Sequence, residues 1–290
     1  KLSAATAAIA ATTTAATATY GCLKTGPSQK SSDTGHAALI PSWDEWGNEI
    51  VEEKYERLKS ISNFSGSNGV AIVDASGKKS TFFTDGRYTL QAKRQVPSEY
   101  FDIMPLTGKA IAKCLSRYEN GRIGFDPYVV RYSYLLYLLS LYPSVEFVAV
   151  DKLIPPKKAK LRGYVEYSRK TELIPEKQAG ASFSQKKSDI FEELEDVKPG
   201  GWYKYILITY PDMISWLLNI RVIDKISIKN SASLGINGYM LLKRDGKDII
   251  YLDDRYSFPK RTSLVVKKLE DVISDLKRIE LQKLYVTRKT

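Results

Sequence analysis

The feature that most constrains the fold is an alternation of short apolar runs with stretches whose apolar residues recur at helical spacing. A turn signal at Ala75-Ser76-Gly77 separates two of the runs and predicts a hairpin. The strands expected in this first half are 37–40, 70–73, 81–83, 101–104, 122–125 and 145–150. The helices expected between them are 52–60, 87–95, a segment that Thr107 caps and Gly121 ends, and 128–141. Strands that alternate with helices in this way indicate an α/β sandwich with a mixed sheet.

The alternation stops and then starts again, which predicts a second domain. Residues 152–180 are rich in Pro, Lys and Glu and show little periodicity, so we predict a linker there. Beyond it we expect a helix capped by Ser184, a strand at 205–209, a short helix opened by Pro211, a hairpin of 239–243 with 249–252, a helix at 264–279 and a final strand at 284–286. The predicted fold class is therefore α/β, with two consecutive α/β domains at 36–151 and 181–290 whose mixed sheets are flanked by helices.

The first 35 residues differ in composition from the rest of the chain. Residues 1–35 are rich in Ala, Thr and Ser and contain no acidic residue before Asp33. This composition predicts a disordered tail, because it offers too little apolar surface to bury. A segment that targets the protein to an organelle has a similar composition and stays open as the alternative.

The sequence excludes several classes of function because it contains few residues of the types that they require. His36 is the only histidine, so the chain alone cannot build a Ser-His-Asp triad or a zinc site with two histidines. The two cysteines, Cys22 and Cys114, are not expected to form a disulfide, which fits a reducing, cytoplasmic location. The net charge is +11, but basic and acidic residues are interspersed, which favours a solvated surface over a nucleic-acid partner. The sequence contains no run of about 18 apolar residues, so it predicts no membrane partner.

Two short motifs in the first domain stand out. The first is 64–69, with the sequence Phe-Ser-Gly-Ser-Asn-Gly, and the second is 84–88, Thr-Asp-Gly-Arg-Tyr. The spacing of Gly66 and Gly69 fits neither of the common phosphate-binding loops, and no Lys-Ser or Lys-Thr pair follows. We therefore interpret the first motif as a tight turn that enters a strand.

Together these motifs resemble the two N-terminal domains of aminopeptidase P (Xaa-Pro aminopeptidase), the creatinase-type N-terminal module. The resemblance runs from about residue 37 to residue 290. In the first domain it is carried by Pro41, Asp44, Glu49, Arg57, 64–69, 84–88, Gln91, Ala92 and 123–127. In the second domain it is carried by 216–221, Trp-Leu-Leu-Asn-Ile-Arg, and by Asp224. Both predicted domains are thus expected to be of the creatinase N-terminal type.

The resemblance implies a hydrolase that releases the N-terminal residue from peptides with proline in second position. In the family two metal ions, usually manganese, are held by two Asp, one His and two Glu on a further, C-terminal catalytic domain. We therefore expect no catalytic residue and no metal ligand in this chain, and no activity from it alone. The expected partners are proline-containing peptides, the chain's own C-terminal catalytic domain and a second copy in a homodimer.

The same resemblance makes Arg87 the candidate substrate-binding residue, because the family's arginine at this motif reaches the peptide substrate. Five fixed donors let a guanidinium orient a carbonyl or a carboxylate. A structural role, with Arg87 paired to Asp85 at the start of a helix, stays open beside it. The chain departs from the family at Val222, at 231–234 and at Trp46, which indicates a divergent member.

Other functions stay open at this point. A protein-binding module that kept the fold and lost catalysis would carry the same motifs. A creatinase or prolidase usually has one N-terminal domain, so the second α/β unit argues against that assignment. The reading frame downstream of residue 290 distinguishes an aminopeptidase from a binding module.

Overall fold

The computed structural model describes residues 36–155, 169–198, 200–223, 235–252, 256–258 and 263–287. The chain divides into two compact units, Lys1–Ala159 and Lys160–Thr290. The division falls inside the segment 152–180 that the sequence predicts to be a linker. The predicted tail, 1–35, lies outside the described residues.

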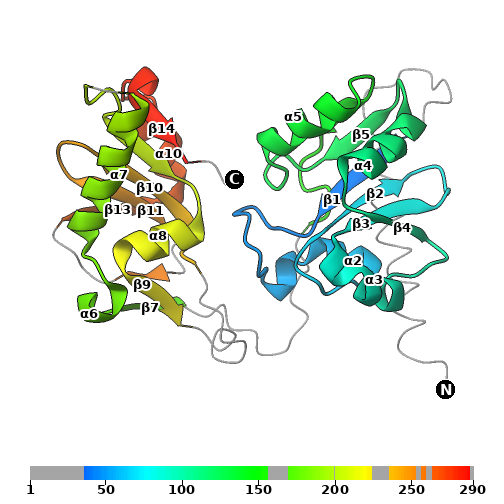
Figure 1. Ribbon diagram of the computed structural model, residues 1–290, viewed down its shortest axis with the longest axis horizontal. Coiled ribbons are helices and arrows are strands. Elements are labelled where there is room, and N and C mark those ends of the chain that lie inside the picture. The colour runs from blue at the N-terminus through cyan, green and yellow to red at the C-terminus, as the bar shows by residue number, and fades with distance from the viewer. Residues whose placement is uncertain are drawn as a thin grey trace. The chain divides into compact units, whose positions relative to one another are not determined.

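The first unit is built on a six-stranded mixed sheet (Figure 1). Its strands, in order across the sheet, are β4 (Phe101–Pro105), β3 (Ser80–Thr84), β2 (Gly69–Asp74), β1 (His36–Pro41), β5 (Arg122–Phe125) and β6 (Glu146–Ala149). The central pairs β1–β2 and β2–β3 are antiparallel, whereas β3–β4, β1–β5 and β5–β6 are parallel. All six strands lie where the hydrophobic pattern predicted them.

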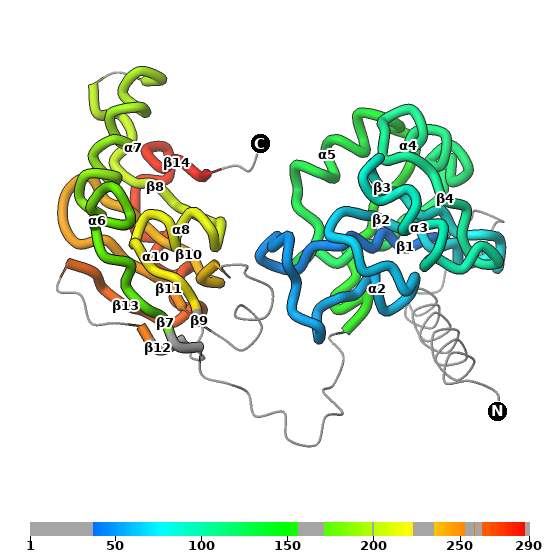
Figure 2. Tube along the Cα trace, turned by 60° about the horizontal axis from the view of Figure 1, so that its bottom comes forward, coloured from blue at the N-terminus to red at the C-terminus, as the bar shows by residue number. Residues whose placement is uncertain are grey.

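Helices cover both faces of this sheet (Figure 1, Figure 2). On one face lie α2 (Arg57–Ser62) and α3 (Thr89–Gln95), and on the other lie α4 (Gly108–Leu115) and α5 (Tyr132–Leu141). The alternation of side chains along β1 explains both layers, because Ala37 and Leu39 pack with α4 and α5 while Ala38 and Ile40 pack with α2 and α3. Short 3-10 turns at Glu53–Tyr55, Gly86–Tyr88 and Ser116–Tyr118 adjoin the helices.

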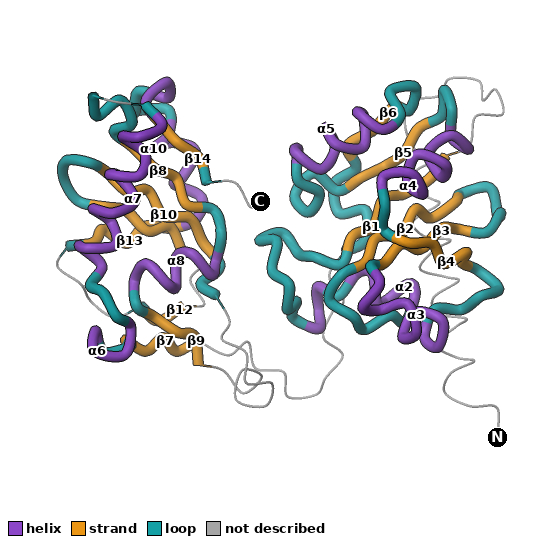
Figure 3. Tube along the Cα trace, viewed as in Figure 1, coloured by secondary structure: helices purple, strands orange, loops and turns teal. Residues whose placement is uncertain are grey.

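The second unit contains a five-stranded sheet and a smaller, three-stranded one (Figure 3). The larger sheet has the order β13 (Leu264–Lys268), β11 (Asp248–Leu252), β10 (Gly238–Lys243), β8 (Tyr205–Ile208) and β14 (Leu284–Val286). The smaller has the order β12 (Tyr256–Ser257), β7 (Arg169–Leu173) and β9 (Ile220–Ile223). Across the larger sheet the strand pairs run parallel, antiparallel, antiparallel and parallel, which repeats the directions from β4 to β5 in the first unit.

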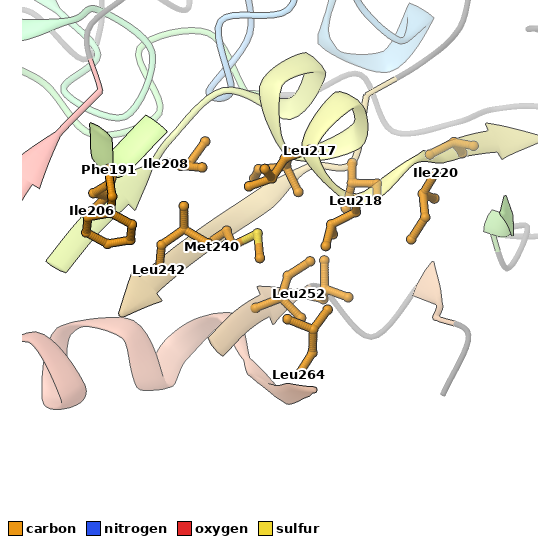
Figure 4. Packing of buried hydrophobic residues seen from close by; sticks show 14 of the residues in the cluster. Phe191, Ile206, Ile208, Leu217, Leu218, Ile220, Met240, Leu242, Leu252 and Leu264 are labelled. Carbon is orange, nitrogen blue, oxygen red and sulfur yellow. The ribbon is translucent and has the colours of Figure 1, made fainter. Parts of the chain in front are cut away.

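The core of the second unit lies between the larger sheet and two helices, α7 (Phe183–Val197) and α8 (Pro211–Leu218). Figure 4 shows Leu217 and Leu218 on α8 facing Met240 of β10. These three side chains are fully buried. The opposite face of the sheet packs against α10 (Val272–Leu276) and the 3-10 turn before it, Leu269–Asp271. Another 3-10 turn, Leu281–Lys283, precedes β14. A one-turn helix, α6 (Glu176–Ala179), precedes α7.

Three predictions for the second half are wrong in detail. The predicted helix 264–279 is a strand, β13, followed by the short helix α10, because Val265 and Val266 pair with Ile249 and Ile250 of β11. Its apolar spacing fits a helix, but β-branched neighbours favour an edge strand. The cap of α7 is Ser182 rather than Ser184. Residues 169–180 of the predicted linker form β7 and α6, which belong to the second unit.

Candidate functional site

The two motifs of the first unit meet at one end of the β2–β3 hairpin. Gly69 begins β2 and pairs with Thr84, the last residue of β3, so the residues before β2 lie beside those after β3. The Thr84 hydroxyl donates to the carbonyl oxygen of Asn68 at 2.6 Å. The Asn68 side-chain amide then donates to Asp85 Oδ2 at 2.8 Å. Sequence segments that are separated by a hairpin thus form one hydrogen-bonded edge.

Asp85 holds Arg87 through three hydrogen bonds. Its Oδ1 accepts the Arg87 backbone N–H at 2.9 Å and Nε–H at 3.1 Å, and its Oδ2 accepts Nη2–H at 2.8 Å. The Arg87 side chain remains 66% exposed. The hydrogen bond from Arg87 is the main reason why the pKa of Asp85 is lowered to about 2, and the same bond raises the pKa of Arg87. Both groups are therefore ionised near neutral pH.

A second chain of polar contacts fixes the loop beneath this pair. The Ser67 hydroxyl lies 2.8 Å from Glu49 Oε1 and 2.8 Å from the hydroxyl of Tyr88. The Tyr88 ring meets the buried Phe64 ring edge-on, with centroids 5.7 Å apart. A side chain at Gly66 would overlap both rings, so this position requires glycine. The predicted turn role of the first motif is confirmed.

We call the surface formed by Glu49, Ser67, Asp85, Arg87 and Tyr88 the Arg87 edge. With Nε and Nη2 engaged by Asp85, Nη1 has no recorded partner within the part of the chain that the structure describes. A planar guanidinium fixed on one side by a carboxylate can donate from its free side to a carbonyl or carboxylate oxygen. The structure shows the pairing with Asp85 that the sequence left open, and the substrate-binding role of Arg87 stays a prediction.

Other residues that carry the resemblance serve the scaffold. Asp44 is buried and accepts the backbone N–H groups of Trp46 and Asn48, both at 3.0 Å, so it organises the loop after β1. Burial raises the pKa of Asp44. Arg57, also buried, forms an ion pair with Glu45 and donates Nε–H to a backbone carbonyl oxygen at 3.0 Å. These charges are used to hold loops together rather than to meet a ligand.

In the second unit the motif 216–221 surrounds the end of α8. Asn219 adopts the left-handed conformation, with φ 53°, and its backbone N–H closes the helix, as predicted for a capping asparagine. The buried ammonium group of Lys186 donates to Asn219 Oδ1 at 2.6 Å and to the carbonyl oxygen of Trp216 at 2.8 Å. Arg221 pairs with Glu172 of β7 at 3.2 Å, within the same unit.

Lys186 was missed by the sequence analysis. A signal was present, because Lys186 lies three residues after Phe183 and four before Ile190, on the face of α7 that packs inward. Val222, the departure from the family pattern, is buried in the core. The other two sequence features, Asp224 and 231–234, lie outside the described residues.

Two kinds of site are absent from the described ranges. No group of three or more His, Cys, Asp or Glu side chains there is arranged to hold a metal ion. None of the described helices has the length and apolar content needed to cross a membrane.

Known proteins with similar sequences fit this architecture. Residues 50–156 match the Creatinase/Prolidase N-terminal domain. The chain is 28% identical to Aminopeptidase P2 of Arabidopsis thaliana over 208 residues, which are 65% of this chain and 27% of that protein. It is 30% identical to the probable Xaa-Pro aminopeptidase P of Ajellomyces dermatitidis over 204 residues, 63% of this chain and 30% of that protein. The chain thus spans less than a third of these curated relatives.

A solved structure extends the comparison to most of the chain. The X-prolyl aminopeptidase of Caenorhabditis elegans, a cytosolic enzyme with a di-nuclear active site, matches with a TM-score of 0.65 at 20% identity. The match covers 83% of this chain and 39% of that protein. At this identity the match establishes the fold alone. The resemblance inferred from the motifs, to the creatinase N-terminal domain and to Xaa-Pro aminopeptidases, is confirmed.

Proposed function

We propose that this chain, which carries a creatinase-type N-terminal domain, is the non-catalytic N-terminal region of an Xaa-Pro aminopeptidase. The similarity to Xaa-Pro aminopeptidases over 65% of the chain supports this assignment. In this proposal the two metal ions and the residues that hydrolyse the bond before proline belong to a catalytic domain outside residues 1–290. The described residues contain no group of three His, Cys, Asp or Glu side chains that could hold a metal ion.

The observation that carries the proposal is the way in which Arg87 is presented. The guanidinium is exposed, yet Asp85 fixes its orientation from one side, and Asn68 fixes Asp85. A pre-oriented donor loses little conformational entropy when it binds a peptide oxygen. We propose that the free Nη1 of Arg87 donates to a carbonyl or terminal carboxylate oxygen of the substrate peptide and thereby positions it.

The test uses a chimeric enzyme in which this chain replaces the aligned region of the Arabidopsis thaliana aminopeptidase P2. With Arg87→Ala we expect kcat/KM for a Xaa-Pro peptide to fall at least tenfold, because a hydrogen bond to a charged group is worth about 1.5–3 kcal/mol. Arg94→Ala is the matched control, since Arg94 is an exposed arginine on the adjacent helix α3. If Arg87→Ala and Arg94→Ala give the same kcat/KM as the unmutated chimera, Arg87 does not contact the substrate.

A separate assay tests the non-catalytic role of residues 1–290. The purified chain is incubated with Mn²⁺ and a fluorogenic Xaa-Pro peptide, and no hydrolysis is expected. Turnover that a chelator abolishes would show that the chain has a catalytic centre of its own and would refute this part of the proposal.

The alternative function is a protein-binding module of the same fold without catalysis. One observation favours a binding face on the first unit: Tyr132 and Leu136 of α5 are 74% and 47% exposed, and Tyr128, in the turn before α5, is 70% exposed. We assign this face to the homodimer that the family resemblance implies. Sedimentation of the purified chain tests the dimer, and the reading frame beyond residue 290 distinguishes an enzyme from a module.

Location and substrate complete the proposal. We propose a cytoplasmic protein that acts on proline-containing peptides, with Cys114 as a buried free thiol in support of a reducing compartment. Fractionation of cells with an antibody against the chain tests the location. Recovery of the chain in an organelle fraction would favour the targeting alternative for 1–35.

A further inference from the structure

A groove in the first unit lies apart from the residues of the Arg87 edge. It is a cavity of about 660 Å³ between the edge strand β4 and helix α4. Met104, Ala110 and Cys114 give it an apolar lining, and Cys114 is almost fully buried. None of these three residues takes part in the polar contacts of the Arg87 edge.

The backbone of β4 is available on the side away from β3. Among the described strands, β4 pairs only with β3. At one end of the β3–β4 ladder the Ser80 N–H donates to the Tyr100 carbonyl, and at the other end the Leu106 N–H donates to the Thr84 carbonyl. Because alternate residues of a strand face opposite neighbours, the N–H and C=O of Ile103 point away from β3.

The free edge is short, which limits what can pair with it. The N–H of Phe101 is already bonded to the Pro97 carbonyl, and Pro105 has no N–H to offer. Ile103 therefore presents both a free donor and a free acceptor at the centre of the edge. Such an edge suits a few residues of an extended peptide rather than a whole additional strand.

The rim of the groove carries positive charge. Lys79, Lys113 and Arg117 lie around it together with one carboxylate, Asp102, so three cations against one anion leave a net charge of +2. Arg117 is held in place by a hydrogen bond of 3.0 Å to the hydroxyl of Thr81 and one of 2.8 Å to the carbonyl of Lys79. The Lys79 ammonium lies 3.8 Å from Asp102, which leaves the charges of Lys113 and Arg117 uncompensated by the groove itself.

We propose that this groove binds an extended acidic peptide segment by strand addition to β4. The segment pairs with the N–H and C=O of Ile103, places one apolar side chain over Met104 and Ala110, and directs carboxylates toward Lys113 and Arg117. A free phosphate would use the cations but neither the apolar lining nor the backbone groups, so the three features together favour a peptide. The segment is a partner held outside the Arg87 edge, whether or not Arg87 contacts substrate.

The first test measures binding to the whole chain by fluorescence anisotropy. The probe is a labelled octapeptide of alternating Val and Glu, and its counterpart alternates Val and Lys. We expect saturable binding of the acidic probe alone, weakened at least tenfold by the double substitution Lys79→Glu and Lys113→Glu. The control is Lys93→Glu with Arg94→Glu, an equal charge change on α3, which covers the opposite face of the sheet.

The second test separates strand pairing from attraction between charges. Ile103→Pro removes the free N–H without removing a ladder bond and is expected to abolish binding, while Ile103→Val keeps the N–H and the affinity. A probe that is N-methylated at every residue cannot donate to the Ile103 carbonyl in any register, and it tests the same point on the unmutated chain if Ile103→Pro fails to fold. Equal binding of the methylated probe, or equal binding of single-stranded DNA of the same charge, would overturn the proposal.

Discussion

Removal of the ammonium group of Lys186 tests how the second unit holds its central helix. Lys186 is 4% exposed, and its Nζ lies 2.6 Å from Asn219 Oδ1, 2.8 Å from the Trp216 carbonyl oxygen and 4.5 Å from the centre of the Trp216 ring. A cation at the C-terminus of α8 also compensates the partial negative charge of the helix end. Lys186→Met keeps an unbranched stem of similar length and removes only the charged, donating end.

The magnitude follows from the contacts that are lost. Two acceptors lose their donor at about 1–3 kcal/mol each. The lower end applies because Lys186, Trp216 and Asn219 line a cavity of about 440 Å³ that water can enter. Loss of the charge at the helix end adds about 0.3–1 kcal/mol. Burial lowers the pKa of Lys186, so removal of the ammonium also returns part of its desolvation cost. We expect a net loss of about 2 kcal/mol.

Hydrogen exchange of the α8 amides, measured by mass spectrometry, is the assay. A loss of about 2 kcal/mol corresponds to roughly 30-fold faster exchange where exchange reports the opening equilibrium. Lys177→Met is the control, because Lys177 is an exposed lysine of α6 in the same unit. If α8 in Lys186→Met exchanges within twofold of the unmutated chain, the ammonium group does not hold the helix end.

Three further predictions follow from single contacts. Thr107→Ala removes the cap of α4 and should lower the unfolding free energy of the first unit by about 1 kcal/mol in urea titration. In Gly238→Ala the new methyl group would overlap the Tyr251 carbonyl oxygen. Because overpacking of a core is costly, this variant should lower the unfolding free energy of the second unit by about 2 kcal/mol or more. The hydrogen bond from Lys267 is the main cause that lowers the pKa of Asp275, which also accepts the Tyr251 hydroxyl. The ionised Asp275 therefore stabilises the fold above pH 3.8, and this stabilisation is lost as the pH falls through the lowered pKa. The unfolding free energies of Asp275→Asn and the unmutated chain should thus differ less at pH 2 than at pH 6.

Local patterns were sufficient for the strands of the first unit, whereas two of its helices begin later than predicted, α2 at Arg57 and α5 at Tyr132. Its central strands are short and apolar, each is bounded by a turn signal, and Thr107 caps the helix that the sequence predicted it to cap. The second unit was harder, because β7 is a largely charged strand whose partner β9 lies about 50 residues away in sequence. A polar strand in a small sheet has little hydrophobic alternation, so only the pairing itself reveals it.

The candidate site divides in the same way. Asp85 and Arg87 are two residues apart in sequence, and their pairing was one of the two roles that the sequence left open for Arg87. The link from Ser67 to Glu49 spans 18 residues, and the link from Lys186 to Asn219 spans 33. Such contacts depend on how elements pack, and they cannot be read from residue type or spacing alone.

The two units share one local feature of their main sheets. In each unit a helix follows the first strand of the main sheet, and a left-handed asparagine ends it: Asn63 after α2 and Asn219 after α8. In the second unit the neighbouring cation, Lys186, is buried and donates to the Asn219 side chain at that helix end. In the first unit the backbone N–H of Asn63 closes α2, as that of Asn219 closes α8, and the nearby motif holds Arg87 at the surface with Asp85 behind it. We therefore expect Arg87→Ala to weaken binding of the proposed substrate, whereas Lys186→Met should lower only the stability of the second unit.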